Sequence, residues 1–457
     1  MSLEKLLKEN RKKYEDELAE FIRIPSVSAR SEHKQDMIRC ANWVSDKLTQ
    51  LGMKAEVLPT KGHPVVYGEL MEAGKSAPTV LVYGHYDVQP VEPLDEWESP
   101  PFEASVRDGR MYARGTADDK GQVHIHMKAL EAYREAKGKP PINLKFLIEG
   151  EEEIGSANLE DFIEGNVSRL TCDAAVISDT PMLSEELPSI CVGLRGLVYM
   201  EVRLSGPHQD LHSGQYGGGV VNPGNALANL ITQLKDDSGR ITIPGFYDAV
   251  KAPSPAEKKA YAEIPMSEED FRREAGVPAI GDGEVGVHFI ERIWARPTLD
   301  VNGLLSGYTG EGSKTIIPAK AMAKVSMRLV PDQDPRMIQE AFERYVRSLK
   351  PEGVDLEIVA HAHAMPWAVD PEGPVFVAAS SAVETVFGRT PLFIREGGSI
   401  PIVPMIEQVL ETPVLLLGFA LPGCNLHSPN EWISLELYHK GIAIMANLYD
   451  EIAKELA

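Results

Sequence analysis

Short apolar runs that alternate with a helical segment constrain the fold of this chain more than any other feature of its sequence. Residues 79–84 (TVLVYG), 142–150 (INLKFLIEG) and 174–178 (AAVIS) have the length and composition of buried strands. Residues 121–138 have the pattern of a helix between the first two runs. Alternation of this kind predicts an α/β fold whose sheet is mixed and contains some parallel pairing.

A fourth run of the same kind, PVLLLGF at 413–419, comes much later in the chain. The intervening sequence has a different composition, with a Gly-rich polar stretch at 206–223 and a Pro- and charge-rich stretch at 244–284. An inserted domain explains this arrangement. We therefore predict a discontinuous first domain over 1–193 and 367–457, and an inserted α+β domain over 194–366.

Charge and cysteine usage exclude several classes of protein. The 457 residues include 46 Lys and Arg against 68 Asp and Glu, a formal net charge of −22, which disfavours binding to nucleic acid and to anionic membranes. The N-terminus lacks an apolar signal-peptide core, and no apolar run is long enough to span a bilayer. Four scattered cysteines without a C-x-x-C pair are typical of reduced thiols, so we expect a cytoplasmic protein.

Ionisable side chains follow the predicted strands where each strand ends. In open α/β sheets, ligand sites lie outside the carboxyl ends of the strands, so these side chains are expected to converge. They are His85 and Asp87 after the first run, Asp118 and Asp119 ahead of the helix, Glu151, Glu152 and Glu153 after the second run, Asp179 after the third, and His427 beyond the last.

Each piece also has an ordinary structural interpretation. A single H-x-D is often an exposed loop, tandem Asp residues before a helix often cap it, and a Glu triplet is often a solvated charge run. Their joint placement at successive strand ends favours a metal site instead. Two His and several carboxylates suit zinc, and also manganese or cobalt. A carboxylate that bridges two ions would lower the pKa of a shared water, and another carboxylate could accept its proton.

Five ordered motifs carry a resemblance to a known family. GHYDVQP, ARGTADDKG, EGEEEIGS, AVISD and NLHSPNE resemble the dinuclear metallopeptidases of the carnosinase, aminoacylase and glutamate carboxypeptidase family, over nearly the whole chain. The resemblance implies two divalent metal ions per subunit, with zinc expected and manganese or cobalt as alternatives. It assigns one role to each of the metal ligands: His85 and Asp179 on the first ion, Asp118 as the bridge, and Glu153 and His427 on the second ion.

The resemblance also implies roles for three carboxylates beside the metals. Glu152 resembles the general base, and Asp87 resembles the carboxylate that orients the His85 ring. Asp119 would follow Asp118 through a cis peptide bond. The family has a pair of Glu residues where this chain has three, and we align the last two because Ile154-Gly155-Ser156 follows them. Glu151 is then outside the site, and a register shifted by one residue stays open.

Motifs in the inserted segment resemble the cytosolic non-specific dipeptidase and carnosine dipeptidase branch of this family. They are SGPHQDLHSGQYGG (205–218), RIWARPTLDVNG (292–303), GSKTIIP (312–318) and MRLVP (327–331). The resemblance implies an inserted lid that also forms a homodimer. His212 would reach the partner's site and polarise the scissile carbonyl, and Arg328 would bind the substrate's carboxylate. Thr315, Ser399 and the backbone of Gly398 would add hydrogen bonds to substrate.

The expected function is hydrolysis of the peptide bond of dipeptides, by a metal-bridging water with a Glu general base. An N-acyl amino acid amidohydrolase, such as an aminoacylase, deacetylase or desuccinylase, is the alternative, and a catalytically silent binding protein is a third possibility. Four other histidines receive separate expectations. His124 and His126 are predicted to lie on the helix surface, and His361 and His363 could share a strand face but lack a third metal ligand nearby.

Overall fold

The computed structural model describes residues 2–281 and 283–456, which form two compact units. The first unit comprises the described residues of Met1–Val192, Asp370–Ile394 and Ile402–Ala457, and the second comprises those of Gly193–Val369 and Arg395–Pro401. The short segment 395–401 lies within the range that the sequence assigned to the first domain. It clusters with the second unit because it is hydrogen-bonded there, through Ser399 to Arg328 and to Arg195.

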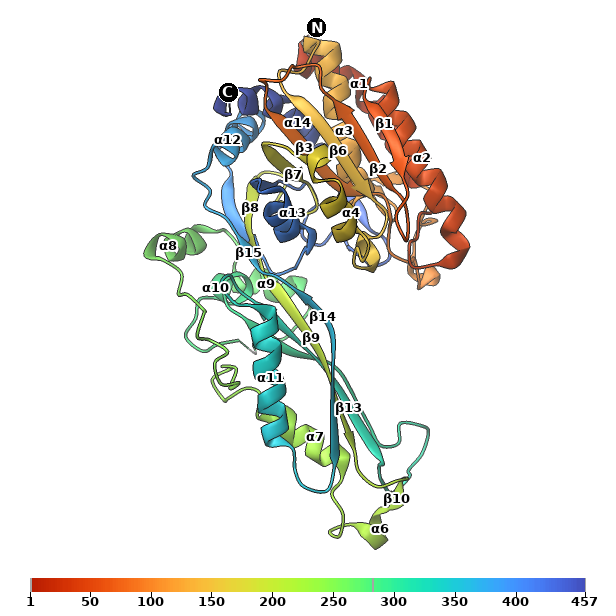
Figure 1. Cartoon of the computed structure of the whole chain (residues 1–457), viewed down its shortest axis with the longest axis vertical. Coiled ribbons are helices and arrows are strands. Elements are labelled where there is room, and N and C mark those ends of the chain that lie inside the picture. The colour runs from red at the N-terminus through yellow and green to blue at the C-terminus, as the bar shows by residue number, and fades with distance from the viewer. Residues whose placement is uncertain (1, 282, 457) are drawn as a thin grey trace. The chain divides into compact units, whose positions relative to one another are not determined.

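The first unit is built on a mixed sheet, which confirms the predicted fold class. Its strand order is β1-β2-β6-β3-β7-β17-β8-β15, with β16 beside β8 (Figure 1). The pairs β3–β6, β3–β7 and β7–β17 are parallel, and the pairs β1–β2, β2–β6 and β17–β8 are antiparallel. The strands that lie wholly or mostly in the first unit are β1 (Lys54–Leu58), β2 (Val65–Leu70), β3 (Thr79–His85), β6 (Asn143–Glu149), β7 (Ala174–Ile177), β8 (Ser189–Leu194), β16 (Leu392–Glu396) and β17 (Val414–Leu416). The residues of β15 (Trp367–Ala368), together with the last residues of β8 and β16, belong to the second unit.

Helices cover this sheet on both faces. In Figure 1, α13 and α4 lie in front of the sheet and α3 lies behind it, where α3 contacts β3, α1 and α14. The helices of this unit are α1 (Leu3–Ile22), α2 (Lys34–Gln50), α3 (Lys120–Lys137), α4 (Leu159–Gly165), α5 (Val167–Leu170), α12 (Pro374–Phe387), α13 (Ile402–Leu410) and α14 (Leu435–Glu455), with 3-10 turns η1 (Ser31–His33), η2 (Leu94–Glu96) and η3 (Glu152–Ile154). No helix among the described residues combines the length and the apolar composition that crossing a membrane requires.

The central position of α3 makes the prediction for His124 and His126 wrong. Both side chains are buried, with 0% and 2% of their surface exposed. The two histidines do point to different sides of the helix, but both sides are covered, because α3 packs against the sheet and against α1 and α14. His124 Nδ1 lies 2.8 Å from the Tyr438 hydroxyl, and His126 Nε2 lies 2.8 Å from Ser178 Oγ.

A small three-stranded sheet joins two distant segments of the first unit. It contains β4 (Ser105–Arg107), β5 (Arg110–Tyr112) and β18 (Trp432–Ser434) in the order β18-β5-β4. The antiparallel register pairs Tyr112 with Trp432. The loops on either side of this pairing carry Asp118 and His427, so the small sheet brings those two residues to one place.

The second unit is an antiparallel sheet covered by helices. Its strands, in the order β11-β13-β9-β14, are β11 (Thr298–Ser306), β13 (Lys320–Leu329), β9 (Gly196–Ser205) and β14 (Asp355–Ala364). The helices are α6 (Ser213–Tyr216), α7 (Pro223–Thr232), α8 (Pro255–Glu263), α9 (Glu268–Glu274), α10 (Phe289–Trp294) and α11 (Pro335–Leu349), and β10 (Leu211–His212) pairs with β12 (Ile316–Ile317).

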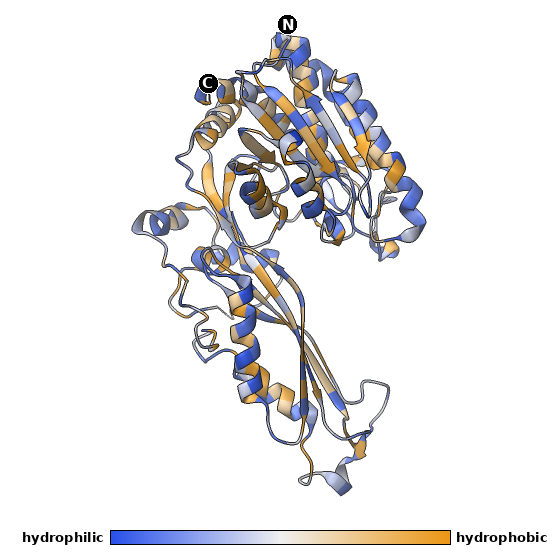
Figure 2. Ribbon diagram, in the orientation of Figure 1, coloured by the Kyte–Doolittle hydropathy of each residue, from blue (hydrophilic) through white to orange (hydrophobic). Residues whose placement is uncertain are grey.

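The amphipathic helix α11 shows how this second core forms. Ile338, Phe342 and Val346 recur at helical spacing and are buried in the core cluster shared with the sheet. The face of α11 turned to the viewer in Figure 2 is mostly hydrophilic. Burial of one apolar stripe against the sheet therefore gives this unit a core of its own.

Candidate metal centre

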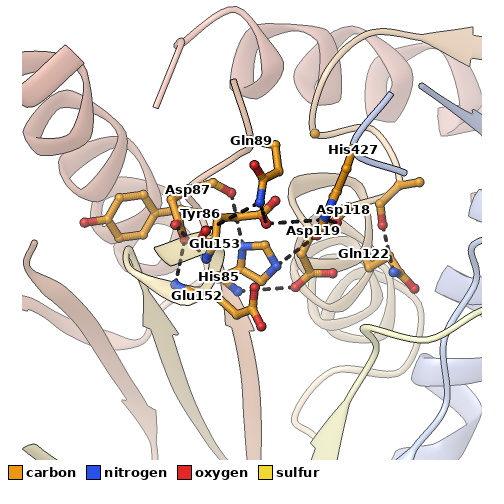
Figure 3. A network of polar contacts seen from close by, with 12 residues as sticks. His85, Tyr86, Asp87, Gln89, Asp118, Asp119, Gln122, Glu152, Glu153 and His427 are labelled. Carbon is orange, nitrogen blue, oxygen red and sulfur yellow. Dashed lines mark hydrogen bonds and ion pairs between the residues drawn. The ribbon is translucent and has the colours of Figure 1, made fainter. Parts of the chain in front are cut away.

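The parallel strands of the first unit end at a common edge of the sheet, and the candidate site forms there. His85 is the last residue of β3, and Asp179 comes two positions after β7. Glu152 and Glu153 open the short turn η3 after β6. Figure 3 shows the side chains of His85, Glu152 and Glu153 converging with those of Asp118 and His427.

Two groups of side chains among the described residues have the geometry to hold a metal ion. His85, Asp118 and Asp179 form one group, and Asp118, Glu153 and His427 form the other. Within each group the potential ligand atoms all lie within 4.8 Å of one another. Asp118 belongs to both groups, so its carboxylate can bridge two ions.

Asp87 organises both sides of this centre. His85 Nδ1 lies 3.1 Å from the Asp87 carbonyl oxygen and 3.3 Å from Asp87 Oδ1. The backbone N–H of Glu152 donates to Asp87 Oδ1 (3.3 Å), and that of Glu153 donates to Asp87 Oδ2 (3.1 Å). Asp87 therefore contacts the His85 ring, as the sequence predicted, and it also anchors the backbone of the Glu pair.

Crowded charges shift the pKa values of the ligand groups. Burial opposes ionisation of Asp118, but hydrogen bonds and charge from His427 and His85 hold its pKa below the ordinary value. Hydrogen bonds to Asp118 and Glu153 raise the pKa of His427 to about 10. Carboxylate oxygens lie within 3.3 Å of ring nitrogens of both His85 and His427, an environment that attracts cations.

Glu152 stands in a different environment. Burial is the main reason that its pKa is raised to about 8, and the negative charges of Asp118, Glu153 and Asp87 add to the effect. Glu152 belongs to neither ligand group. A carboxylate placed beside the ligands with a raised pKa suits proton transfer more than coordination.

Unpaired polar atoms in the centre fit a divalent cation. Glu153 Oε1 and Asp119 Oδ1 are buried and make no hydrogen bond within residues 2–281 and 283–456, and the buried His85 Nε2 has only the Asp118 carboxylate beside it, at 3.1 Å. His85 Nε2 and Glu153 Oε1 belong to residues of the two ligand groups. Imidazole nitrogen and carboxylate oxygen are ligands that zinc, manganese and cobalt accept, so the donor set fits two such ions.

The backbone around the centre is unusual at two places. The peptide bond between Asp118 and Asp119 is cis, as the resemblance implied. His427 has φ of +59°, and Asn425 and Asn430 in the same loop have φ of +58° and +61°. Positive φ at a histidine is uncommon and concentrates at functional sites. The loop therefore holds His427 in the left-handed region of φ, which few residues other than glycine adopt.

Glu151 lies outside both groups. Its Oε1 accepts a hydrogen bond from the His63 N–H (3.0 Å), and its Oε2 accepts one from Asn158 Nδ2 (2.8 Å). Glu151 is therefore committed to the neighbouring loops, whereas Glu153 faces His427 at 3.3 Å. This arrangement is the one expected if Glu152 and Glu153, and not Glu151, correspond to the pair of Glu residues in the family motif.

Comparison with known proteins identifies the family. The profile described as Peptidase family M20/M25/M40 matches residues 81–451. The chain belongs to peptidase family M20/M25/M40. It is 34% identical to the Cys-Gly metallodipeptidase dug1 of Schizosaccharomyces pombe, over 99% of each chain. It is 32% identical to the Beta-Ala-His dipeptidase of Homo sapiens, over 96% of this chain and 89% of that protein.

Comparison with solved structures supports the assignment of this chain to the M20 peptidase family. An M20 family metallo-carboxypeptidase from Sulfolobus solfataricus superposes with a TM-score of 0.86 at 34% identity, covering 96% of this chain and 99% of that one. Human carnosine dipeptidase 1 superposes with a TM-score of 0.85 at 30% identity, covering 99% of both chains. The mixed-sheet fold is thus that of M20 metallopeptidases.

The residues predicted to contact substrate lie in the second unit of the peptidase. Arg328, on β13, donates from Nη1 to Ser399 Oγ (2.9 Å), and Gly398 precedes Ser399 in the same segment. His212 pairs with Ile316 across the β10–β12 ribbon, and the Ser213 N–H donates to the Thr315 carbonyl (3.1 Å). The structure therefore brings these residues together as two local sets, and both His212 and Thr315 are exposed.

Sequence reasoning missed three residues around these sites. Gln89 donates from Nε2 to Glu153 Oε2 (2.7 Å), and its place in the GHYDVQP motif was the available signal. Glu431 accepts hydrogen bonds from the loop of Asp118 and lies in the motif that contains His427. Arg195 donates from Nε to the Gly397 carbonyl (3.1 Å), and no local pattern marks it.

The two histidines on β14 are not part of a metal-ligand group among the described residues. His361 Nε2 lies 2.9 Å from Glu201 Oε2, and the same Glu201 carboxylate accepts a hydrogen bond from Arg203 Nε (2.6 Å). The Glu201 carboxylate is thus shared by an arginine and an imidazole. This pairing favours a structural ion-pair network over the metal site that the sequence left open for His361 and His363.

Proposed function

We propose that this peptidase is a dinuclear metal-dependent dipeptidase of the cytoplasm. The observation that carries the proposal is the position of Asp118, which is shared by two complete ligand groups. The curated relatives that are named metallodipeptidase or dipeptidase support the substrate class. The four cysteines, which are scattered along the sequence without a C-x-x-C pair, support a reducing compartment.

The residues that would hold the metals are those of the two groups. His85, Asp118 and Asp179 would hold one divalent ion, and Asp118, Glu153 and His427 would hold the other, with zinc as the expected metal. When bound, such ions lower the pKa of a water and polarise the scissile carbonyl. Asp87 fixes the His85 ring through its contact with Nδ1, which points Nε2 toward Asp118, where both side chains could ligate one ion.

Glu152 would perform the proton transfers. One of its Oε atoms accepts the proton of the attacking water and later delivers it to the nitrogen of the leaving amine. Burial raises the pKa of Glu152, which favours a proton on this side chain, and nearby cations would lower that pKa. Asp87 holds the Glu152 backbone N–H and so helps to fix the origin of the side chain.

Arg328 is the proposed ligand of the substrate carboxylate. Its guanidinium is partly buried and already donates to Ser399 Oγ, which restricts its orientation. A planar guanidinium binds a carboxylate with two parallel hydrogen bonds. Ser399, the Gly398 backbone and Thr315 would add hydrogen bonds. If this carboxylate site lies one residue from the scissile bond of a bound substrate, exopeptidase activity follows.

His212 is proposed to act across a homodimer interface. Its Nδ1 accepts a hydrogen bond from the Gly214 N–H (3.1 Å), which leaves Nε2 free to donate to a carbonyl oxygen. In the partner's site this donor would stabilise the developing oxyanion. Mixing tests the idea: His212→Ala and Glu152→Gln subunits, each inactive alone, should regain activity as heterodimers. Absence of activity in proven heterodimers would contradict shared sites.

Two other activities use the same centre. The similarity to the Sulfolobus solfataricus metallo-carboxypeptidase favours removal of C-terminal residues from longer peptides as one alternative. An amidohydrolase for N-acyl amino acids is the other, because it needs the same carboxylate site. In both cases the group on the amino side of the scissile bond differs from that of a dipeptide.

One kinetic panel separates these activities. It contains dipeptides with free amino termini, N-blocked dipeptides, tripeptides, and acetyl- and succinyl-amino acids. The activity on each substrate and the metal content of the enzyme are measured before and after chelation. We expect the highest kcat/KM for free dipeptides, loss of activity after chelation, and recovery with zinc or manganese. Preferential turnover of acyl amino acids or of N-blocked peptides would overturn the dipeptidase assignment.

A further inference from the structure

Glu431 is a fully buried carboxylate outside both ligand groups, with 0% of its surface exposed. Its Oε1 accepts hydrogen bonds from the backbone N–H groups of Ala117 (2.8 Å) and Asp118 (3.1 Å). Its Oε2 accepts one from the Gly115 N–H (2.9 Å) and one from Arg114 Nη1 (2.8 Å). One side chain therefore pairs three backbone donors and a buried cation in the segment that carries Asp118.

The same residue belongs to the segment that carries His427. The Glu431 carbonyl accepts a hydrogen bond from the Ala113 N–H (3.0 Å), and the β5–β18 pairing continues this contact. The two segments meet at the metal centre, where His427 Nε2 lies 2.9 Å from Asp118 Oδ2. Glu431 thus connects, through both its backbone and its side chain, two ligands that are far apart in sequence.

Its removal would disturb the Asp118 segment more than a surface mutation would. Arg114 has 1% of its surface exposed, and Glu431 is the carboxylate that pairs with it. A buried cation without its partner is unstable, and backbone N–H groups without acceptors carry a desolvation penalty. The segment would relax to regain partners, and Asp118 would move with it.

We propose that Glu431 is a positioning residue that sets the metal affinity of this centre. It does so by holding Asp118 close enough to His427 for both side chains to ligate the same ion. The inference rests on the metal site of the proposed function. Because Asp118 belongs to both ligand groups, both ions should bind more weakly when it is displaced. Loss of a partner that orients a ligand typically weakens metal binding about 10- to 100-fold.

The test is metal titration of the Glu431→Gln apoprotein. Calorimetric titration with Zn²⁺ should give dissociation constants raised about 10- to 100-fold relative to wild type. The visible absorption of the Co²⁺ form should also change, because it reports ligand geometry. Glu436→Gln is the matched control, since Glu436 is a half-exposed residue whose carboxylate pairs with Arg11. That variant should bind as wild type does.

The outcomes are distinct. Equal metal affinity in wild type and Glu431→Gln would overturn the inference, even if the variant unfolds at a lower temperature, because a purely structural role predicts that result. Wild-type protein that binds no divalent ion would instead contradict the proposed function. If Glu431→Gln does not fold, Arg114→Lys keeps the buried charge but loses the guanidinium fork that joins Glu431 to the Pro90 carbonyl. Its metal affinity should fall several-fold, and unchanged affinity would equally overturn the inference.

Discussion

His427 Nε2 lies 2.9 Å from Asp118 Oδ2, although 309 positions separate the two residues in the chain. The contact closes a centre in which one aspartate serves two ligand groups. The loop presents the His427 ring to the carboxylates from a backbone with φ of +59° at this residue. Chemistry at this centre depends on two loops that the small sheet of β5 and β18 holds together.

The roles of the adjacent Glu residues can be separated by mutation. Glu152→Gln should retain metal but lose about 10²- to 10⁴-fold in kcat, because the amide cannot accept the proton of water. Glu151→Gln is the matched control and should keep most of the activity, since Glu151 contacts His63 and Asn158 instead. Steady-state kinetics with metal analysis checks both. Loss of kcat with metal retained in Glu151→Gln, together with loss of metal in Glu152→Gln, would mean that the register is shifted by one residue.

The number of metal ions bound per chain should distinguish Asp118, which belongs to both ligand groups, from His427, which belongs to one. His427→Ala removes a ligand of one group only, so about one tightly bound ion per chain should remain. Asp118→Asn weakens the bridging ligand of both groups, and both ions should be lost together. Elemental analysis after dialysis measures the content. Retention of two ions in Asp118→Asn would contradict a bridging role.

Arg328 should determine preference for a free carboxylate. Arg328→Met should lower kcat/KM for a dipeptide about 10- to 100-fold, as expected for loss of a charged hydrogen bond worth about 1.5–3 kcal/mol. The corresponding dipeptide amide should be affected much less. Arg203→Met, on the neighbouring strand β9, is the control, since Arg203 pairs with Glu201 and Glu357. Equal losses on both substrates would argue against carboxylate binding.

Metal removal should destabilise the first unit. Chelation leaves the carboxylates of Asp118, Glu152 and Glu153 crowded in a buried space without a cation. Free zinc at 100 times its dissociation constant should stabilise the protein by about 2.7 kcal/mol. Thermal unfolding across a zinc titration measures this, and magnesium at the same concentration is the control. A midpoint independent of zinc would contradict the site.

The stability of the second unit should depend on pH through Glu396. Burial raises the pKa of Glu396 from 4.5 to about 7, although the charge of Arg195 opposes the shift. Because the folded pKa is the higher one, the stabilisation is fully present below pH 4.5 and is lost as the pH rises to about 7. The loss amounts to roughly 3 kcal/mol, since each pKa unit corresponds to about 1.4 kcal/mol.

Glu396→Gln carries no ionisable group at this position, so its stability should lack this component of the pH dependence. Unfolding midpoints of wild type and variant should therefore diverge between pH 4.5 and 7, with the variant relatively more stable at the higher pH. The difference should be constant above pH 8. Parallel profiles over the whole range would show that Glu396 titrates normally.

Much of the fold and the ligand set follows from local sequence. The runs at 79–84, 142–150 and 174–178 are apolar because the strands β3, β6 and β7 are buried on both faces, and their composition alone indicates this. The helix at 121–138 matches α3 within one residue at each end. Ionisable residues that directly follow buried strands are also readable, because parallel strands present their carboxyl ends at one edge.

Tertiary structure decided what depends on contacts between distant segments. His124 and His126 are buried because the sheet covers one side of α3 and α1 and α14 cover the other. Nothing in the local sequence distinguishes Glu431 from an ordinary loop residue. In the folded chain its carboxylate accepts hydrogen bonds from four donors of segment 114–118. Arg195 likewise contacts a segment two hundred positions away.

The physical reason is the range of the interactions. The sequence by itself determined which segments are strands or helices and which side chains can ligate a metal, because periodicity and side-chain chemistry are local properties. Only the folded chain decided which of these side chains meet, because burial and hydrogen-bond pairing are set by whichever segment packs alongside. Asp118 illustrates both kinds of information. The sequence identifies it as a carboxylate that can ligate a metal, and the folded chain places it where its backbone N–H donates to Glu431.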